Sequence, residues 1–317
     1  MIGKKMDYLL YGIYNKILIK TMGFSRVVNR TKAYGGKRYL VAEVGNNYIS
    51  ENLKSDKPFF AARFGASEIA VMRQCEEKGL GFRKHLTPEI RKQLETWSGF
   101  FPNDTEERFL KFYDVMRDAS SQVDLLGVWY NPMENYFVKH YCTNLKFTTN
   151  LTGLEPWYYQ KPWSQELKGK KVLIIHPFAD TIKEQYSKRE QIYPNGLLPE
   201  CTLYTLKAVQ TLAGERDPRF TDWFQALDYM FRQSIKYDFD VAIIGCGAYG
   251  FPLGAKIKMY GKQVIHLGGA TQLLFGIKGK RWDNIPEVAC LYNNYWVRPN
   301  KSEVISKRKA VEEGCYW

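Results

Sequence analysis

The sequence predicts an α/β protein with a doubly wound, mostly parallel, Rossmann-like sheet. Short apolar runs bounded by turn residues, such as 57–65, 123–130 and 170–178, alternate with helix-like segments. Residues 238–269 have the pattern of a strand, a glycine-rich turn, a helix and a second strand, which together make a βαβ unit. No long Pro/Gly/Ser linker divides the chain, so we expect residues 39–317 to form one domain.

The elements of the first half follow from local signals. Residues 57–65 are expected to be a buried strand that stops at a turn, and residues 67–79 a helix. Thr87 is a suitable N-cap for a further helix, with Pro88 at its first position. Another helix begins near Asp104, and residues 123–130 form a second buried strand.

In the second half, residues 170–178 contain four consecutive aliphatic residues before a His-Pro pair, which favours a strand. We expect a helix over 201–214, closed by Gly214, and another over 221–236. A charged helix is expected to end the chain.

The charge of the chain is unevenly distributed. There are 46 Lys and Arg against 33 Asp and Glu, a formal charge of +13, and residues 1–38 alone carry +8. An anionic partner is therefore expected. The remaining residues are close to balanced, which argues against a uniformly basic nucleic-acid binder. The 15% of aromatic residues suits stacking on sugars or bases, although large cores also use them.

Residues 1–38 are expected to form a basic amphipathic appendage. An apolar stripe at helical spacing contains Met6, Leu9, Leu10, Ile13, Ile17 and Leu18. Such a helix packs on the protein's own core or on a second subunit of a homo-oligomer, or it lies on an anionic membrane surface. Lysines interrupt the segment too often for a spanning helix or a secretory signal.

The cysteines and the N-terminus together predict a location. None of the six cysteines lies within four residues of another, so no CxxC pair is present. We expect buried thiols in a reducing cytoplasm, and a protein that is cytoplasmic or peripheral at the inner face of the cell membrane.

The turn after the first strand contains the sequence RFGASE. Arg63 near the strand end is suited to grip a phosphate, with Gly65 in the turn, and Glu68 at the start of the next helix to act as a base or metal ligand. The alternative is an Arg–Glu ion pair that fixes the turn. Ligands of parallel sheets bind at such carboxyl ends of strands.

A second candidate group follows residues 170–178. His176 is a candidate base or phosphate donor, and Asp180 a candidate binding residue, although a structural histidine beside a helix cap explains both equally. Glu155 and Glu200 each adjoin a proline and are candidates for a base or for contacts to sugar hydroxyls. An exposed loop acid is the alternative.

Two glycine-rich strand ends suggest phosphate binding. The segment that begins at Gly245 matches the GxGxxG spacing between a strand and a helix, where backbone amides approach a phosphate. A tight strand–helix turn without a ligand is the alternative. The candidate binding residues here and in the following segments are Gly245, Gly247, Tyr249, Gly250, His266, Gly268, Gly269, Thr271, Lys278 and Arg281. A solvated charged loop explains Lys278 and Arg281 equally well. The ribose-binding acid of a dinucleotide fold is missing from its expected place, about 20 residues on, which weakens NAD binding.

The RFGASE turn resembles the RFGDGE-type turn of GT-D fold glycosyltransferases, and other segments resemble bacterial polysaccharide-biosynthesis proteins. The likeness covers roughly residues 55–285. In that family an Asp and a Glu of the turn bind Mn²⁺ and the sugar-nucleotide diphosphate. Arg63, Gly65 and Glu68 match, but Ala66 replaces the Asp, which places a role for Mn²⁺ or Mg²⁺ at Glu68 in doubt.

The resemblance implies a glycosyltransferase that moves a sugar from a nucleotide-sugar, with UDP the expected nucleotide. The implied acceptor is a surface polysaccharide such as a capsule or O-antigen, or a lipid-linked glycan. Glu68, His176 or Glu155 would activate the acceptor hydroxyl, and Lys278 or Arg281 would stabilise the leaving group. The alternatives are a non-catalytic sugar-nucleotide or glycan-binding protein and another nucleotide-dependent Rossmann enzyme, such as a dehydrogenase.

Overall fold

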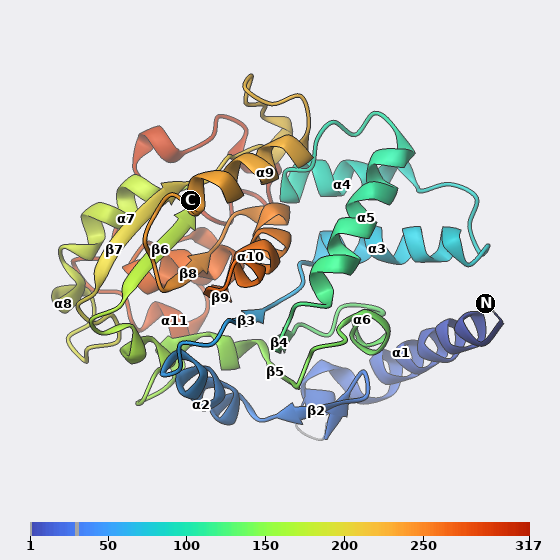
Figure 1. Cartoon of the computed structure of the whole chain (residues 1–317), viewed down its shortest axis with the longest axis horizontal. Helices are drawn as coiled ribbons and strands as arrows, with labels where there is room; N and C mark the ends of the chain where they lie inside the picture. Colours follow the sequence, from blue (N-terminus) through green and yellow to red (C-terminus); the bar gives the residue numbers. More distant parts are fainter. Residues whose placement is uncertain (1, 29–31) are drawn as a thin grey trace.

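The computed structural model describes the backbone of residues 2–28 and 32–317, and the side chains of residues 2–17 and 32–317. Within these ranges nine strands form one sheet in the order β1-β2-β5-β4-β3-β9-β8-β6-β7 (Figure 1). β1 and β2 are antiparallel, and the other neighbours are parallel. The strands are β1 (Ala33–Tyr34), β2 (Lys37–Leu40), β3 (Phe59–Ala62), β4 (Leu125–Val128), β5 (Phe147–Asn150), β6 (Lys171–His176), β7 (Thr202–Lys207), β8 (Val241–Ile244) and β9 (Gln263–His266). The predicted α/β class is confirmed.

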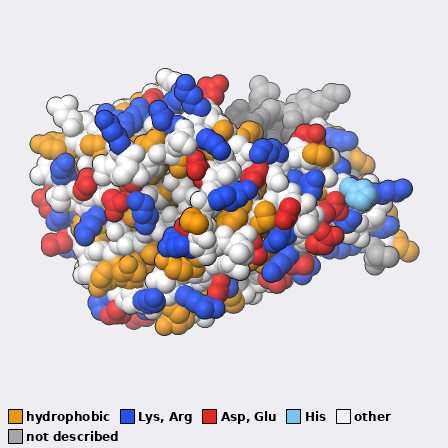
Figure 2. Space-filling model, turned by 90° about the horizontal axis from the view of Figure 1, so that it is seen from above, with side chains coloured by type: hydrophobic (Ala, Val, Ile, Leu, Met, Phe, Trp, Pro, Cys, Tyr) orange, Lys and Arg blue, Asp and Glu red, His pale blue; other side chains and the backbone are white. Residues whose placement is uncertain are grey.

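Helices cover both faces of the sheet, since alternate side chains of each strand point to opposite sides. In β3, Phe60 and Ala62 join one apolar core, and Phe59 and Ala61 join the other. The first core packs against α3 (Ala66–Gly79), α4 (Pro88–Ser98), α5 (Glu106–Ser120), α6 (Glu134–Tyr141), α9 (Trp223–Ser234) and α10 (Gly250–Met259). The second packs against α2 (Ala42–Leu53), α7 (Ala179–Tyr186), α8 (Arg189–Ile192) and α11 (Pro286–Ala289). Acidic and basic side chains are interspersed over the face seen in Figure 2.

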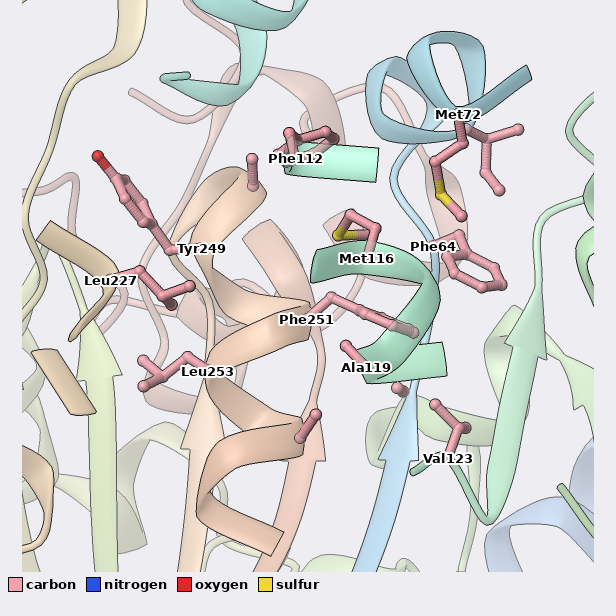
Figure 3. Close-up of a cluster of buried hydrophobic side chains, with 14 of the residues drawn as sticks. Phe64, Met72, Phe112, Met116, Ala119, Val123, Leu227, Tyr249, Phe251 and Leu253 are labelled. Carbon is pink, nitrogen blue, oxygen red and sulfur yellow. The ribbon is translucent and has the colours of Figure 1, made fainter. Parts of the chain in front are cut away.

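The first core also positions the turn that follows β3. Phe64 stacks on Phe251 of α10, with ring centres 4.7 Å apart (Figure 3). Both rings are buried, so the contact holds the end of β3 against the start of α10. The residues on either side of Phe64 are thereby fixed in place.

A topological switch point lies between the neighbouring strands β6 and β8. The chain leaves β6 through α7 to reach β7 on one side, and it leaves β8 through α10 to reach β9 on the other. Ile182 of α7 and Leu253 of α10 belong to different cores, so the two crossovers cover opposite faces. Open α/β sheets bind ligands at the carboxyl ends of strands at such a point.

The predicted N-terminal helix is α1 (Ile2–Val28), which lies at the edge of the molecule beside α6 (Figure 1). The side chain of Leu18, predicted to belong to its apolar stripe, is outside the described residues. Beyond α1 the segment 1–38 already enters the sheet, because β1 and β2 form a hairpin and β2 pairs with β5. Among the helices that the structure describes, none has the length and apolarity needed to cross a bilayer.

Two sequence predictions of helices are wrong. Residues 201–214 form β7 and a short 3₁₀ turn, Leu212–Gly214, and β7 pairs with β6 along its whole length. Thr202, Tyr204 and Thr205 favour a strand because β-branched and aromatic side chains pack well on a pleated surface. The chain also ends without a charged helix. Residues 298–317, all described, contain only short 3₁₀ turns.

Candidate functional site

A cleft of about 110 Å³ lies at the carboxyl ends of β3, β9, β8 and β6. Its walls are the turns after these strands, the end of α4 and the C-terminal residues. Of the predicted site residues, the cleft brings together Arg63, Gly65, Glu68, His176, Gly245, Gly247, His266, Gly268, Gly269 and Arg281. Segments distant in the sequence therefore meet at the sheet edge where parallel α/β proteins bind ligands.

The guanidinium group of Arg63 lies over an aromatic ring in this cleft. Its guanidinium carbon lies 4.2 Å from the centre of the Trp129 ring, within the range of a cation–π contact. Burial lowers the pKa of Arg63, and the charge of Arg281 acts in the same direction, while Glu68 and Glu155 oppose it. Two like charges thus interact across one cleft, which favours an anionic ligand between them.

Glu68 is the third residue of α3 and folds back over the start of that helix. The N-cap is Gly65, and a Cβ atom there would lie only 1.9 Å from Glu68 Oε2. Gly65 therefore makes room for the carboxylate, which occupies the usual place of a capping glutamate. Burial raises the pKa of Glu68, while its own backbone amide, Arg63 and the Ser98 side chain lower it.

The donor atoms at this turn do not fit the divalent ion that the family resemblance implies. Glu68 is the one carboxylate of the turn, Ala66 offers no ligand, and the Glu68 carboxylate lies against the helix start. Within residues 2–28 and 32–317 no group of three or more His, Cys, Asp or Glu side chains is placed to hold a metal ion. Mg²⁺ and Ca²⁺ require several oxygen ligands, so no chemical step is assigned to a metal here.

The two histidines of the cleft are buried and neutral. Burial lowers the pKa of both His176 and His266 to about 3, and the charge of Arg63 adds to the effect at His266. The Phe178 amide donates to His176 Nδ1 at 3.0 Å, so the proton of the neutral ring belongs on Nε2. His176 is thus suited to donate a hydrogen bond rather than to act as the base that was one of its predicted roles.

Glycines allow the cleft's turns to approach one another closely. Gly247 has φ +58°, and a Cβ atom there would lie 2.7 Å from the Ser98 carbonyl oxygen. A Cβ atom on Gly245 would lie 2.2 Å from the Gly268 carbonyl oxygen. These turns therefore require glycine for backbone packing, and Gly245 and Gly247 line the cleft.

Two solved structures are similar to this chain. The chain is similar to two structures of the domain of unknown function 1792, one selenomethionine-substituted and one described as having a distinct glycosyltransferase fold. Identity is 16% and 17%, the TM-scores are 0.45 and 0.42, and each match covers 74% of this chain and 79% of the other. No protein-family model and no curated protein matches the sequence.

Two acids, buried Glu134 and half-buried Glu155, interact with Arg63 without lining the cleft. Burial raises the pKa of Glu155 to about 7, opposed by the charge of Arg63. Burial likewise raises the pKa of Glu134 to about 7, although the amides of Asn131 and Trp129 donate to its carboxylate. Glu155 was predicted, but Glu134 was missed because it starts a helix after an irregular turn and follows no motif.

Besides Glu155, six predicted site residues lie outside the cleft lining, and three of them face other surroundings: Asp180, Glu200 and Lys278. Asp180 Oδ2 pairs with Lys207 Nζ at 3.0 Å on the surface. Glu200 is exposed, as the loop-acid alternative supposed. Lys278 Nζ lies 5.1 Å from the centre of the Tyr292 ring, and neither residue lines the cleft.

The remaining predicted residues outside the cleft lining are Tyr249, Gly250 and Thr271. They pack beneath the turns that line the cleft. The Tyr249 hydroxyl is 2.9 Å from Thr211 Oγ1 inside the core. A Cβ atom on Gly250 would lie 2.5 Å from His266 Nε2, so this glycine makes room for the histidine. Thr271 donates to a backbone carbonyl at the end of β8 at 3.2 Å.

The aromatic and C-terminal walls of the cleft were not predicted from the sequence. Trp97 lies in the last turn of α4, Trp129 follows β4, and Tyr316 and Trp317 are the last two residues of the sequence. A Cβ atom on Gly269 would lie 2.2 Å from the Tyr316 ring, so the C-terminal segment packs directly against the turn after β9. An aromatic terminal pair is a weak signal, because its path over the fold is not encoded in local periodicity.

Proposed function

We propose that the protein is a glycosyltransferase that uses a nucleoside diphosphate sugar, with UDP the favoured nucleotide. The observation that carries this proposal is the pair Arg63 and Arg281, both lining one cleft at the carboxyl ends of parallel strands. A diphosphate supplies the negative charge that two guanidinium groups in one cleft favour. Trp97 and Trp129 in the same cleft suit stacking on a base or sugar ring.

In the proposed reaction an acceptor hydroxyl oxygen attacks the anomeric carbon of the donor sugar. The bond from that carbon to the diphosphate breaks, and the nucleoside diphosphate leaves with the electron pair. Arg63 and Arg281 stabilise the developing negative charge, and His176 donates a hydrogen bond to a phosphate oxygen. Glu68, the predicted carboxylate that lines the cleft, takes the proton of the hydroxyl. The acceptor is proposed to be a surface polysaccharide or a lipid-linked glycan.

The size of the cleft constrains how a donor enters. A volume of about 110 Å³ is smaller than the ~300 Å³ at the lower end of small-molecule sites. One wall of the cleft is the C-terminal segment, where Glu312 and Tyr316 contact Arg281. This is the wall that we propose moves. Donor binding is therefore proposed to displace residues 311–317.

A non-catalytic sugar-nucleotide or glycan-binding protein is the second candidate. Ala66 and the position of Glu68 favour it, because the carboxylate is occupied at the start of α3. Such a protein would keep the two arginines and the stacking rings but would lack turnover.

Turnover and binding assays separate these candidates. Purified protein is incubated with UDP-, GDP- and CMP-sugars, and released nucleotide is measured beside binding of each donor. Release from one donor class, lost in Arg281→Ala, is the expected result. Tight binding with no release, with or without a glycan acceptor, would favour the binding protein. NAD(H) binding in a fluorescence titration would instead favour a dehydrogenase.

A further inference from the structure

Helix α1 packs on the protein through its polar and aromatic side. Lys4 Nζ lies 2.9 Å from Glu76 Oε1, the Tyr8 hydroxyl donates to Glu77 at 2.9 Å, and Asn15 Nδ2 donates to Asn135 at 3.0 Å. Positions 4, 8, 11 and 15 share one side of the helix, since each is three or four residues from the next. This side makes the contact with α3 and α6.

The opposite side of α1 is aliphatic and exposed. Ile2, Met6, Leu9, Leu10 and Ile13 lie about half a turn from the docked side. Their exposed fractions are 82%, 60%, 51%, 58% and 56% in the part of the chain that the structure describes. A surface helix normally buries such a stripe and exposes its polar side. Here the arrangement is reversed, which marks the stripe as a surface for a partner.

The docked side holds the stripe in a fixed orientation. The buried carboxylate of Glu76 accepts hydrogen bonds from the hydroxyls of Tyr113, Tyr136 and Tyr141, and it pairs with Lys4. The Tyr8 ring is buried and meets the Tyr136 ring edge-on, with centres 5.0 Å apart. The stripe therefore cannot turn inward without breaking this network.

The charges around the stripe favour an anionic lipid surface over a second copy of the chain. Lys5 and exposed Lys16 flank it, whereas the one acid of residues 2–28, Asp7, is paired with Lys139 and His140 on the docked side. Paired helices normally place opposite charges beside the apolar seam. Two copies of α1 would bring lysine to lysine, whereas anionic headgroups would match both lysines.

We propose that α1 lies in the interface of an anionic bilayer, with this aliphatic stripe in the outer acyl region and its lysines at the headgroups. Phe82 adds to the surface, because its ring is 44% exposed and Lys5 Nζ lies 5.9 Å from its centre. The proposal concerns binding alone and does not depend on the proposed transferase activity.

Flotation with vesicles tests it on the full chain. Vesicles of phosphatidylcholine alone and with phosphatidylglycerol are compared for wild type, for the double variant Leu9→Asp/Ile13→Asp, and for Val44→Asp, a control at an exposed position on α2. Substitutions are used because deleting α1 would uncover Tyr136 and Glu76. Wild type and Val44→Asp should float with the anionic vesicles. The double variant should bind them at least about tenfold more weakly, with an unchanged unfolding temperature, and 0.5 M NaCl should weaken wild-type binding.

Three results would overturn the proposal. Wild-type protein that stays at the bottom of the gradient lacks the membrane contact. Equal flotation with neutral vesicles removes the role of the lysines. A wild-type dimer in lipid-free sedimentation that the double variant converts to a monomer would show that the stripe is a protein interface.

Discussion

The Arg63 guanidinium carbon lies 4.2 Å from the centre of the Trp129 ring. A cation therefore lies over an aromatic ring in the cleft at the carboxyl ends of the strands. The neighbouring residue Phe64 stacks on Phe251 and holds the backbone of Arg63 in place. Arg63 is thereby preorganised, and its planar fork of donors remains aligned for a phosphate.

Arg63→Lys should weaken binding of nucleoside diphosphate about tenfold or more, and Arg63→Ala about a hundredfold. Lysine keeps the charge but loses the stacked plane and the bidentate fork. Isothermal titration with UDP measures both. The matched control is Arg219→Lys, because Arg219 also lies over a ring, Tyr229, but outside the cleft. Equal affinity of Arg63→Ala and wild type would remove Arg63 from the site.

Glu68→Gln and Glu68→Ala separate a capping role from a catalytic one. The alanine variant should lose about 1 kcal/mol of stability, because the start of α3 loses its cap. The glutamine variant keeps a hydrogen-bond acceptor and should stay close to wild type in thermal unfolding. If Glu68 is the base, both should lose about 10²–10⁴ in turnover. Wild-type turnover by Glu68→Gln would assign the carboxylate to the helix cap alone.

Turnover should not depend on a divalent ion. Ala66 and the capping position of Glu68 leave too few oxygen ligands at the turn. Turnover is measured after EDTA treatment and again with added Mn²⁺ or Mg²⁺, and equal rates are expected. A rate that disappears in EDTA and returns with Mn²⁺ would contradict this. Asp180 is a poor replacement ligand, because it pairs with Lys207 outside the cleft.

Glu155 should make stability depend on pH. Burial raises the pKa of its carboxyl from 4.5 to about 7, so folding takes up a proton between these values. Its contribution to stability is present below pH 4.5 and is lost as the pH rises through about 7. Glu155→Gln should therefore gain stability relative to wild type, by at most about 3 kcal/mol, between pH 4.5 and pH 8. Chemical denaturation at both values measures this, with exposed Glu200→Gln as the control. The same difference at both pH values would show that Glu155 ionises normally.

Local sequence signals predicted the strand ends well. The runs before Arg63, His176, Gly245 and His266 are apolar and stop at turn residues, and parallel strands bring their carboxyl ends to one edge. The central βαβ unit, residues 238–269, was predicted for the same reason, and the structure has it as β8, α10 and β9.

Other features depend on tertiary contacts that no local pattern contains. The strand β7 was taken for a helix because its apolar spacing fits both periods, and pairing with β6 decides between them. Tyr316 reaches the cleft only because Gly269 leaves room for its ring. Trp129 follows β4 but acquires its role from Arg63, which arrives from a different strand.

Hydrogen exchange with and without a UDP-sugar tests whether the donor binds in this cleft, because it locates the ligand on the chain. Amides in 63–68, 245–250 and 266–281, which surround the cleft, should be protected, whereas 311–317 should exchange faster as the C-terminus moves aside. Residues 115–122, which lie in a separate pocket, should not change and serve as an internal control. Arg63→Ala should abolish the protection. Protection confined to other segments, or none at a donor concentration that supports turnover, would contradict the assignment of this cleft as the donor site.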